Sequence, residues 1–307
     1  MSIGFITHFS FRLHDMGQGH PESPQRLSAI EDALIAARLM DFLTLYEAPM
    51  AEDQDILLVH DQEYLQYLKK QAPEEGLVSL DVDTALGPHS LQAAYRAVGA
   101  AVMGVDLLMK GEVKHCFCAV RPPGHHAERD RAMGFCVFNN LAIAAAYALK
   151  VHALKRIVVI DFDVHHGNGT EQMLADDERV LICSSFQHPF YPGKPFCETN
   201  SRVINVPLPA HTDSATFRQV ISEQWFPAIR SFQPELFFVS AGFDAHQQDP
   251  LAGLNLTTRD FAWLGEQIRV LADESAQGRV LSTLEGGYNL QALGESVVAY
   301  LRPFLGL

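Results

Sequence analysis

Short apolar runs alternate with longer helical patterns along most of this chain, and this alternation limits the folds that it can adopt. The apolar runs have the length of strands, which predicts strands at Cys116–Val120, Arg156–Asp161, Val180–Ser184, Val203–Val206, Leu236–Ser240 and Val280–Leu284. Apolar residues at helical spacing predict helices at Pro24–Leu39, His89–Met109, Asn140–Leu149, Ser214–Arg230, Thr258–Glu274 and Leu290–Leu301. Strands that alternate with helices are typical of βαβ units, so the sequence predicts an α/β fold with a mostly parallel sheet.

Local signals mark two helix starts and one less regular region. Ser23 followed by Pro24 predicts an N-cap and a first helical residue. Thr257 with Asp260 predicts a capping box. We expect the first ninety or so residues to form helices and loops packed around the sheet. No repeat or linker divides the chain, so residues 1–307 are predicted to form one domain.

The composition excludes some classes of partner. The formal net charge of −14 argues against nonspecific nucleic-acid binding. It favours a cationic substrate, such as a lysine-bearing peptide or a polyamine, although acidity that only maintains solubility explains it equally well. No apolar run is long enough to span a bilayer, and no secretory signal opens the chain, so no membrane partner is expected. Five cysteines do not suggest a disulfide framework, and a reduced cytoplasmic setting follows as an inference.

Four predicted strands run into loops that are rich in polar residues. These loops are Arg121–Ala127, Ile160–Glu171, Ala241–His246 and Glu285–Asn289. Ligands of α/β sheets bind beyond the carboxyl ends of the strands, which meet at one edge when the strands are parallel. The four loops are therefore predicted to share a site.

Asp163, His165 and Asp244 are the most economical set of metal ligands in these loops. A catalytic zinc ion usually has three protein ligands and one open position. In an extended segment the D-x-H spacing places Asp163 and His165 on the same side, and Asp244 closes the site from another strand. Taken alone, Asp244 fits an Asx-turn or helix cap, and His165 fits a hydrogen-bonded core histidine. Because two carboxylates make a hard site, Fe(II), Co(II) or Mn(II) could compete with Zn(II).

The adjacent histidines His125 and His126 follow a rigid Pro-Pro-Gly turn. A histidine pair provides the base and the acid that amide hydrolysis needs. Asp161 is predicted to orient one imidazole and raise its proton affinity, and Asn168 to orient the other without adding charge. The structural alternatives are a turn with one exposed imidazole and, for Asn168, a turn residue between two glycines.

Tyr288 follows Gly286 and Gly287, which permit a tight turn. Its hydroxyl could donate to the oxyanion that develops as a carbonyl becomes tetrahedral. Taken alone, Tyr288 is better explained as a packing residue. His166 has no predicted role beyond packing or hydrogen bonding near the site.

Taken together, these motifs resemble those of the zinc-dependent deacetylase family. That family comprises histone deacetylases, bacterial histone deacetylase-like amidohydrolases, acetylpolyamine amidohydrolases and acetoin-utilisation proteins. The segments that carry the resemblance keep their order along nearly the whole chain: Gly19–Leu27, Arg121–Ala127, Gly134–Asn140, Ile160–Thr170, Ser240–Asp244 with Asp249–Leu251, and Glu285–Tyr288. The resemblance implies an arginase/deacetylase-like three-layer fold with a mostly parallel eight-stranded sheet flanked by helices.

The resemblance also implies a reaction. It implies Zn(II) bound by Asp163, His165 and Asp244, and removal of acetyl or other acyl groups from lysine side chains by attack of a zinc-bound water. The general base and acid would be His126. His125, paired with Asp161, would be its electrostatic partner. Tyr288 would polarise the acyl carbonyl.

A substrate channel and a second ion are implied as well. Gly134 and Phe135 would line an acyl-lysine channel, with Tyr191 on the other wall. A structural K⁺ ion would lie near the zinc loop, held by Asp161, Asp163, His165, Ser184 and Ser185.

Two details place the chain within this family. Asn168 and the segment Leu284–Tyr288 resemble the class II type. Leu251 stands where polyamine-specific members carry a glutamate, which resembles lysine deacetylases. The leading hypothesis is therefore a class II-like bacterial amidohydrolase acting on an acyl-lysine peptide or protein.

Three alternatives stay open. The nearest is an amidohydrolase that acts on acetylpolyamines or other small acyl amides. The others are a noncatalytic acyl-lysine binding module and a binuclear ureohydrolase, although the latter typically needs more carboxylates. A homo-oligomer is compatible with the sequence, which does not determine the oligomeric state, the acyl length or the native metal.

Overall fold

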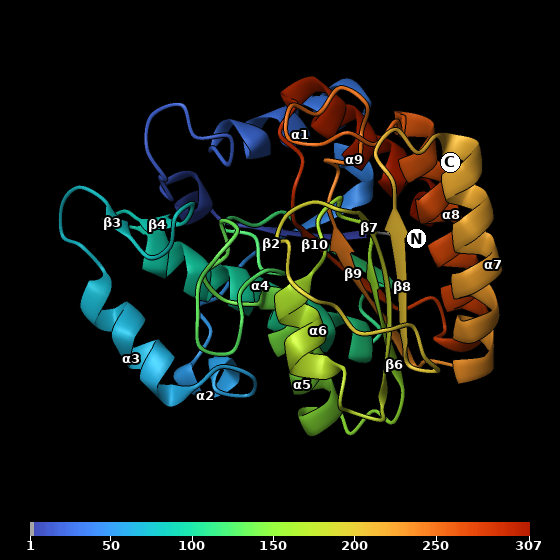
Figure 1. Ribbon diagram of the computed structural model, residues 1–307, viewed down its shortest axis with the longest axis horizontal. Coiled ribbons are helices and arrows are strands. Elements are labelled where there is room, and N and C mark those ends of the chain that lie inside the picture. Colours follow the sequence, from blue (N-terminus) through green and yellow to red (C-terminus); the bar gives the residue numbers. More distant parts are fainter. Residues whose placement is uncertain (1–2) are drawn as a thin grey trace.

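The computed structural model describes residues 3–307 and places eight strands in one parallel sheet (Figure 1). The strand order from edge to edge is β2-β1-β5-β10-β9-β6-β7-β8. The bounds are β1 Ile3–Thr7, β2 Leu43–Glu47, β5 His115–Cys118, β6 Ile157–Asp161, β7 Val180–Gln187, β8 Val203–Leu208, β9 Leu236–Ala241 and β10 Val280–Leu284. The predicted α/β fold with an eight-stranded parallel sheet is confirmed, and all six predicted strands are present.

Helices cover both faces of this sheet (Figure 1). The side chains of β10 show the two faces: Leu281 meets α4, where a Cβ on Gly104 would lie 2.4 Å from it, whereas Ser282 lies 2.8 Å from the Tyr300 hydroxyl of α9. The longer helices are α1 Gln25–Ala36, α3 Gln62–Gln71, α4 Ser90–Met109, α5 Asn140–Val151, α7 Ser214–Phe232, α8 Thr258–Ser275 and α9 Leu290–Leu305. Because both faces are covered, the central strands β6, β9 and β10 are buried along their whole length.

The amino-terminal region contributes more to the sheet than the sequence predicted. β1 pairs with both β2 and β5, so the expectation that this region would form only helices and loops is wrong. A half-exposed edge strand such as β2 has a weak apolar pattern, and β1 is only five residues long. Short elements complete the region: η1 Phe9–Arg12, η2 Met40–Phe42, α2 Asp53–Ile56, β3 Val78–Ser79 and β4 Ala85–Leu86.

The two predicted helix starts have different outcomes. Thr257 and Asp260 form the expected capping box at α8, in which the Thr257 N–H donates to Asp260 Oδ2 over 2.7 Å. At α1 the prediction was wrong by one residue, because Pro24 occupies the cap position and the helix begins at Gln25. Ser23 precedes the cap, and only its backbone carbonyl accepts a hydrogen bond, from the Arg26 N–H.

All eight strands point the same way, so the segments that follow β5, β6, β9 and β10 meet at the carboxyl ends of the strands. These segments are the four polar loops of the sequence. No helix between residues 3 and 307 is long and apolar enough to cross a membrane.

Candidate metal and catalytic centre

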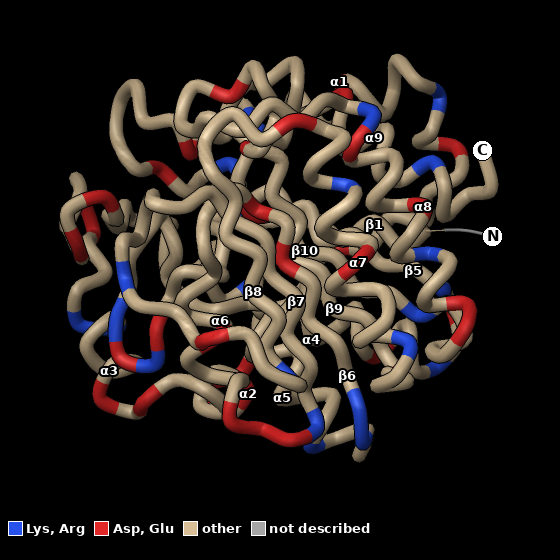
Figure 2. The backbone as a smooth tube through the Cα atoms, turned by 45° about the vertical axis from the view of Figure 1, so that its right-hand side comes forward, with Lys and Arg blue, Asp and Glu red and all other residues tan. Residues whose placement is uncertain are grey.

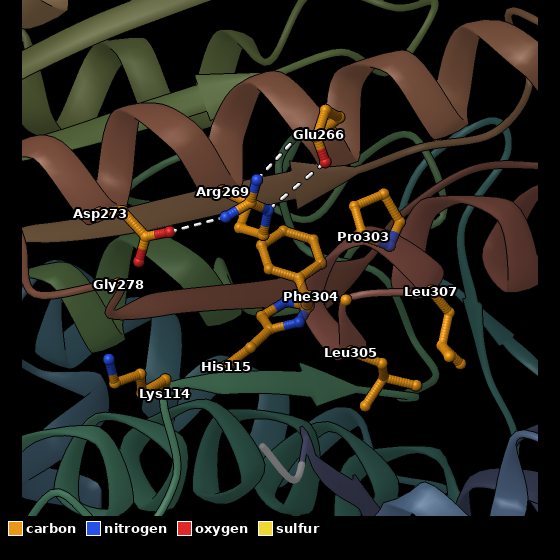
Figure 3. A pocket seen from close by; sticks show the side chains of 11 residues that line it. Lys114, His115, Glu266, Arg269, Asp273, Gly278, Pro303, Phe304, Leu305 and Leu307 are labelled. Atoms are coloured by element: carbon orange, nitrogen blue, oxygen red, sulfur yellow. Dashed lines mark hydrogen bonds and ion pairs between the residues drawn. The ribbon is translucent and has the colours of Figure 1, made fainter.

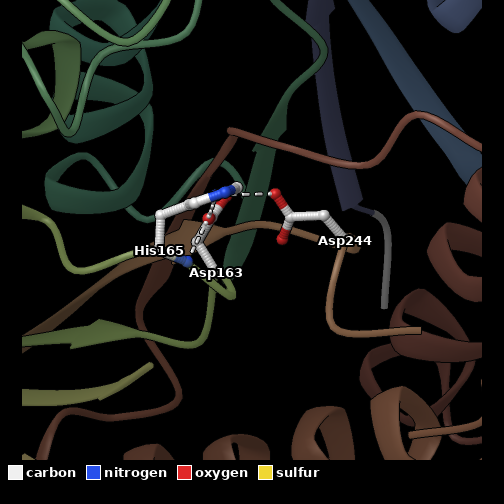
Figure 4. Close-up of side chains that lie close together, drawn as sticks. All are labelled: Asp163, His165 and Asp244. Carbon is white, nitrogen blue, oxygen red and sulfur yellow. Dashed lines mark hydrogen bonds and ion pairs between the residues drawn. The ribbon is translucent and has the colours of Figure 1, made fainter. Parts of the chain in front are cut away.

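Two of the polar loops bring Asp163, His165 and Asp244 together (Figure 4). One potential ligand atom of each residue lies within 4.8 Å of the other two. His165 Nδ1 is 3.0 Å from Asp163 Oδ1 and 3.2 Å from Asp244 Oδ2. The three residues predicted to bind metal thus form one cluster, which we call the metal triad.

The segment that carries Asp163 and His165 is bent, whereas the sequence predicted an extended one. β6 ends at Asp161, and residues 163–165 form a bend. The His165 N–H donates to Asp163 Oδ1 over 2.9 Å, so the carboxylate closes the bend that brings the two side chains together. The prediction that the pair would meet is correct, but the geometry behind it differs.

Backbone groups hold the two carboxylates in place. The Gly286 N–H donates to Asp163 Oδ2 over 2.8 Å, and the Val164 N–H donates to Asp244 Oδ1 over 2.9 Å. A Cβ on Gly286 would lie 2.0 Å from Asp244 Oδ2, so a side chain at this position would displace the carboxylate. Asp244 Oδ2 is buried, and its contact within the described chain is the ion pair with His165 Nδ1 at 3.2 Å. This oxygen has a further lone pair that can bind a ligand.

Electrostatics in the triad favour a cation between the carboxylates. Burial and the charge of Asp163 raise the pKa of Asp244 to about 7. Burial acts to lower the pKa of His165, but its contacts with Asp163 and Asp244 outweigh burial and raise that pKa to about 10. Two like charges held this close in a buried site destabilise each other, and a bound divalent cation would relieve the repulsion.

The two adjacent histidines have different partners. His125 Nδ1 lies 3.0 Å from Asp161 Oδ2, whereas His126 Nδ1 lies 2.8 Å from Asn168 Oδ1. Burial lowers the pKa of His125, but the charges of Asp163 and Asp161 outweigh it and raise that pKa to about 10. Burial, together with the charges of His125 and His165, holds the pKa of His126 well below its usual value. The pair therefore combines a protonated imidazole with a neutral one, a division suited to acid–base chemistry.

Glu285 supports the histidine pair, a role that its place in the sequence does not reveal. Its buried carboxylate accepts the N–H groups of Gly124 and His125 over 2.7 and 3.1 Å. Burial raises the pKa of Glu285 to about 7. A glutamate directly after a buried strand was the only available signal, because its partners lie 160 residues away in the sequence.

Tyr288 comes from the loop after β10 and packs beside Phe135, with ring centroids 5.8 Å apart. Its N–H donates to Asp249 Oδ2 over 2.7 Å, and the Arg26 guanidinium carbon lies 5.0 Å from the ring centroid. Gly287 has φ of 120°, a conformation that favours glycine. Burial raises the pKa of the Tyr288 hydroxyl well above its usual value, so the hydroxyl stays a proton donor.

Of the residues predicted to line a substrate channel, Gly134, Phe135 and Tyr191 pack against His126 or Tyr288. Gly134 packs directly against His126, since a Cβ there would lie 2.4 Å from the imidazole. Tyr191 meets the His126 ring edge-on, at 5.0 Å between centroids. Phe135 has φ of 67°, and its N–H donates to Thr84 Oγ1 over 2.9 Å. Leu251 is half-buried, and its N–H donates to Asp249, which also holds Tyr288.

Two serines lie next to Asp161 in the sheet, where the resemblance implies a potassium ion. Asp161 and Ser184 are paired neighbours on β6 and β7, and Ser185 follows on β7. The Ser184 hydroxyl is buried and has no hydrogen-bond partner among the described residues. Serine and carboxylate oxygens are hard donors that suit an alkali cation.

His166 does not join the triad. Its Nε2 lies 3.2 Å from Glu171 Oε2, and its ring packs 4.7 Å from that of Phe186. Of the two adjacent histidines, His165 therefore belongs to the metal triad, whereas His166 packs in the core.

A second buried charge cluster lies beneath Tyr288, and the sequence analysis did not predict it. Glu22 accepts from Arg121 Nη2 over 2.7 Å and from Arg26 Nη1 over 3.1 Å. Arg26 Nε donates to the Gly287 carbonyl over 2.7 Å. We call Glu22, Arg26 and Arg121 the Glu22 cluster, and its side chains are fully buried.

A cavity of about 470 Å³ lies at the opposite edge of the sheet, where β5 and β10 begin (Figure 3). Arg269 on its wall is held by Glu266 and Asp273, and the buried His115 packs 3.8 Å from Phe304. His115 Nε2 lies 3.0 Å from Ser282 Oγ. The cavity and the metal triad therefore lie at opposite ends of the strands.

Comparison with known proteins identifies the family to which the chain belongs. Residues 20–303 match the histone deacetylase domain. The chain is 36% identical to the histone deacetylase-like amidohydrolase of Pseudomonas aeruginosa, over 94% of this chain and 75% of that protein. It is 38% identical to histone deacetylase 10, chloroplastic, of Oryza sativa subsp. japonica, over 94% of this chain and 70% of that one.

A solved structure agrees with these matches. The crystal structure of the HDA15 HD domain superposes with a TM-score of 0.92 at 31% sequence identity, covering 99% of this chain and 90% of that one. The eight-stranded sheet, the polar edge and the sequence matches lead to one conclusion. The chain belongs to the histone deacetylase family, whose members are hydrolases acting on acylated amides.

Proposed function

We propose that this protein is a metal-dependent amidohydrolase that removes acetyl or other acyl groups from lysine side chains. One observation carries the proposal: the metal triad lies beside two histidines, of which one is bound to a carboxylate and the other to an amide. This combination supplies the metal ligands and two imidazoles in opposite protonation states.

The residues of the triad fit a Zn(II) ion. Asp163, His165 and Asp244 offer two oxygens and a nitrogen, and the buried Asp244 Oδ2 has no other partner in the described chain. A zinc ion held there would act as a Lewis acid on the acyl carbonyl and on the attacking water. Fe(II) and Co(II) suit the same donor set.

The chain's own residues would handle the proton and the developing charge. His126, kept neutral, accepts the proton of the attacking water at Nε2, since Nδ1 is engaged with Asn168. The same imidazolium then protonates the leaving amine nitrogen. His125, bound to Asp161, stays protonated and adds positive charge near the reacting centre. Tyr288 donates its hydroxyl proton in a hydrogen bond to the carbonyl oxygen as it becomes negative.

The walls of the proposed channel favour an uncharged acyl-lysine stem. Gly134 and the ring of Tyr191 pack against His126, Phe135 packs against Tyr288, and Leu251 adds no charge. Asp and Glu outnumber Lys and Arg by 37 to 23, and Figure 2 shows acidic positions spread over the chain. A basic segment around the acylated lysine would be attracted by this field.

Two further expectations belong to the proposal. A K⁺ ion would be held by oxygens of Asp161, Asp163, His165, Ser184 and Ser185, and the unpartnered Ser184 hydroxyl supports this. A reducing, cytoplasmic setting is supported by the five cysteines, which are all free thiols.

A comparison of substrates tests the proposal against its nearest alternative. Zinc-loaded protein should hydrolyse an acetyl-lysine peptide with a higher kcat/KM than acetylspermidine, and longer acyl-lysine peptides define the acyl preference. A strong preference for acetylspermidine would support the small-molecule amidohydrolase instead. Binding of the peptide without turnover would support a noncatalytic binding module.

A further inference from the structure

We propose that Glu128 is a positioning residue. By fixing the orientation of the Asn168 side-chain amide, it determines which ring nitrogen of the catalytic histidine, His126, carries the proton. The inference rests on the proposed function, in which His126 is the base. Glu128 lies outside the metal triad and belongs to the loop after β5. Only 8% of its surface is exposed.

Three side chains form a chain of hydrogen bonds from Glu128 to His126. Asn168 Nδ2 donates to Glu128 Oε1 over 2.7 Å, and Asn168 Oδ1 lies 2.8 Å from His126 Nδ1. A carboxylate only accepts hydrogen bonds, so it must face the NH₂ end of the amide. If the amide turned over, Oδ1 would face the carboxylate, and two acceptors would be in contact. The His126 carbonyl and Met133 Sδ also lie on the Nδ2 side, but at 3.4 Å each, so the 2.7 Å bond to Glu128 is the shortest contact that fixes which end of Asn168 meets the imidazole.

The orientation of the amide decides where His126 carries its proton. A neutral imidazole has one N–H and one lone pair, and the partner of Nδ1 selects between the two tautomers. With Asn168 Oδ1 as the partner, Nδ1 donates and Nε2 keeps the lone pair that accepts a proton from water. With Asn168 Nδ2 as the partner, Nε2 would carry the hydrogen and could not act as a base. Glu128 thus favours the reactive tautomer of His126 through the hydrogen bonds of Asn168, without contacting the imidazole itself.

Two cations hold the carboxylate in this position. Lys194 forms an ion pair with Glu128 Oε1, the oxygen that also accepts from Asn168, and Arg131 Nη2 lies 3.2 Å from Oε2. Lys194 belongs to the loop that also carries Tyr191, which packs against the His126 ring. The two cations therefore hold the carboxylate from both sides, and Asn168 connects it to His126 by hydrogen bonds.

Kinetics of Glu128 variants distinguish a role in positioning Asn168 from a role in packing alone. Glu128→Leu removes the acceptor, and we expect kcat on an acetyl-lysine peptide to fall roughly 10–100-fold, the usual cost of losing such a supporting partner. KM should change by less than about twofold, because the substrate does not touch this residue. Glu128→Gln should recover most of the loss, because Lys194 still attracts the amide oxygen toward Asn168. Glu274→Leu is the matched control: it makes the same substitution at a largely exposed carboxylate that pairs with Arg230, outside the site, and should leave kcat unchanged.

The tautomer is measured directly, without turnover. Histidine-¹⁵N NMR of the purified protein, with and without added Zn(II), identifies the His126 signal by its loss in His126→Ala. Wild type and Glu128→Gln should show the Nδ1–H form, and Glu128→Leu a shift toward Nε2–H. If wild type proved inactive on all acyl-lysine peptides, the proposed function would fail while this spectrum would still decide the positioning role. An unchanged tautomer in Glu128→Leu, or equal loss of kcat in the Leu and Gln variants, would overturn the inference.

Discussion

Two buried charge clusters lie within this fold, and they differ in how their charges are balanced. In the Glu22 cluster one carboxylate faces two guanidinium groups, and every nitrogen of Arg26 and Arg121 that can donate has an acceptor. In the metal triad two carboxylates share one imidazole nitrogen, His165 Nδ1, and Asp244 Oδ2 has no partner beyond it among the described residues. The first cluster is complete, whereas the second has an acceptor to spare.

This difference separates a structural role from a functional one. A buried ion pair that is fully hydrogen-bonded keeps its neighbours in place, and losing one partner leaves an uncompensated charge. The Glu22 cluster supports the Tyr288 loop in this way, through Gly287 and Glu285 carbonyls. An excess of buried negative charge is instead costly for the fold alone, and its presence at a strand edge indicates a cation site.

The largest expected effect comes from Asp244→Asn. The variant keeps Oδ1 as an acceptor for Val164 but loses a charged ligand, so we expect no measurable turnover and much weaker zinc binding by calorimetry. Burial and Asp163 raise the pKa of Asp244 to about 7, so ionisation of this group costs stability as the pH rises from the unfolded pKa of about 4 to the folded pKa, and the cost is complete above it. Chelator-treated Asp244→Asn should therefore be at least as stable to urea at pH 8 as chelator-treated wild type. Marked destabilisation would contradict the account of the triad.

Glu22→Gln should have the opposite signature. Because Arg121 and Arg26 would keep their charge without a buried counterion, we expect a loss of about 3–5 kcal/mol in the free energy of unfolding. Glu31→Gln is the control, because it breaks the partly exposed pair with Arg12 and should cost no more than about 1 kcal/mol. Equal losses in the two variants would show that burial does not distinguish these pairs.

Wild type and Glu22→Gln also give a test by the pH dependence of stability. Burial acts to raise the pKa of Glu22, but the charge of Arg121 and the other contacts outweigh it and hold that pKa well below 4.5. A depressed pKa stabilises the folded state above the unfolded pKa, and the stabilisation is lost as the pH falls through the folded value. The stability difference between wild type and Glu22→Gln should be constant from pH 5 to 7 and shrink in stronger acid. A difference that grows in acid would contradict this assignment.

Tyr288→Phe tests a group that acts on the substrate and not on the fold. Loss of one donor to a developing oxyanion costs on the order of a hundredfold or more in kcat. Tyr300→Phe is the control, because Tyr300 is a buried tyrosine whose hydroxyl meets Ser282 away from the triad. Steady-state kinetics should show the rate loss only in the first variant, and an unchanged rate there would remove Tyr288 from the mechanism.

The smallest effect is expected at the proposed potassium site. Ser184→Ala removes the buried hydroxyl that has no partner within the described residues, and we expect K⁺ to stabilise the variant less than wild type by about 1 kcal/mol. Thermal unfolding in KCl and in NaCl at equal ionic strength measures this. Identical K⁺ stabilisation in both proteins would argue against Ser184 as a ligand.

The sequence was sufficient for the central strands and for the residues that follow them. Long apolar runs such as Ile157–Ile160 are distinctive because parallel strands are buried on both faces, and polar residues directly after them are conspicuous. Asp163, His165, Asp244 and the histidine pair could therefore be selected before their geometry was known.

Features that depend on distant contacts could not be predicted. β1 joins β5 more than a hundred residues later, and β2 is a half-exposed edge strand with a weak pattern. Arg26 reaches the Gly287 carbonyl across 261 residues of sequence. No sequence pattern distinguishes Glu128 from a surface glutamate, and only the fold shows that Asn168 faces it.

The most direct test of the account is the metal dependence of turnover in one preparation. Chelator-treated protein, loaded stepwise with Zn(II), should show hydrolysis of an acetyl-lysine peptide that rises in proportion to bound metal and saturates at one ion per chain. Elemental analysis of each sample gives the metal content. Undiminished turnover in metal-free protein, or activity that requires two ions per chain, would contradict the proposed centre at Asp163, His165 and Asp244.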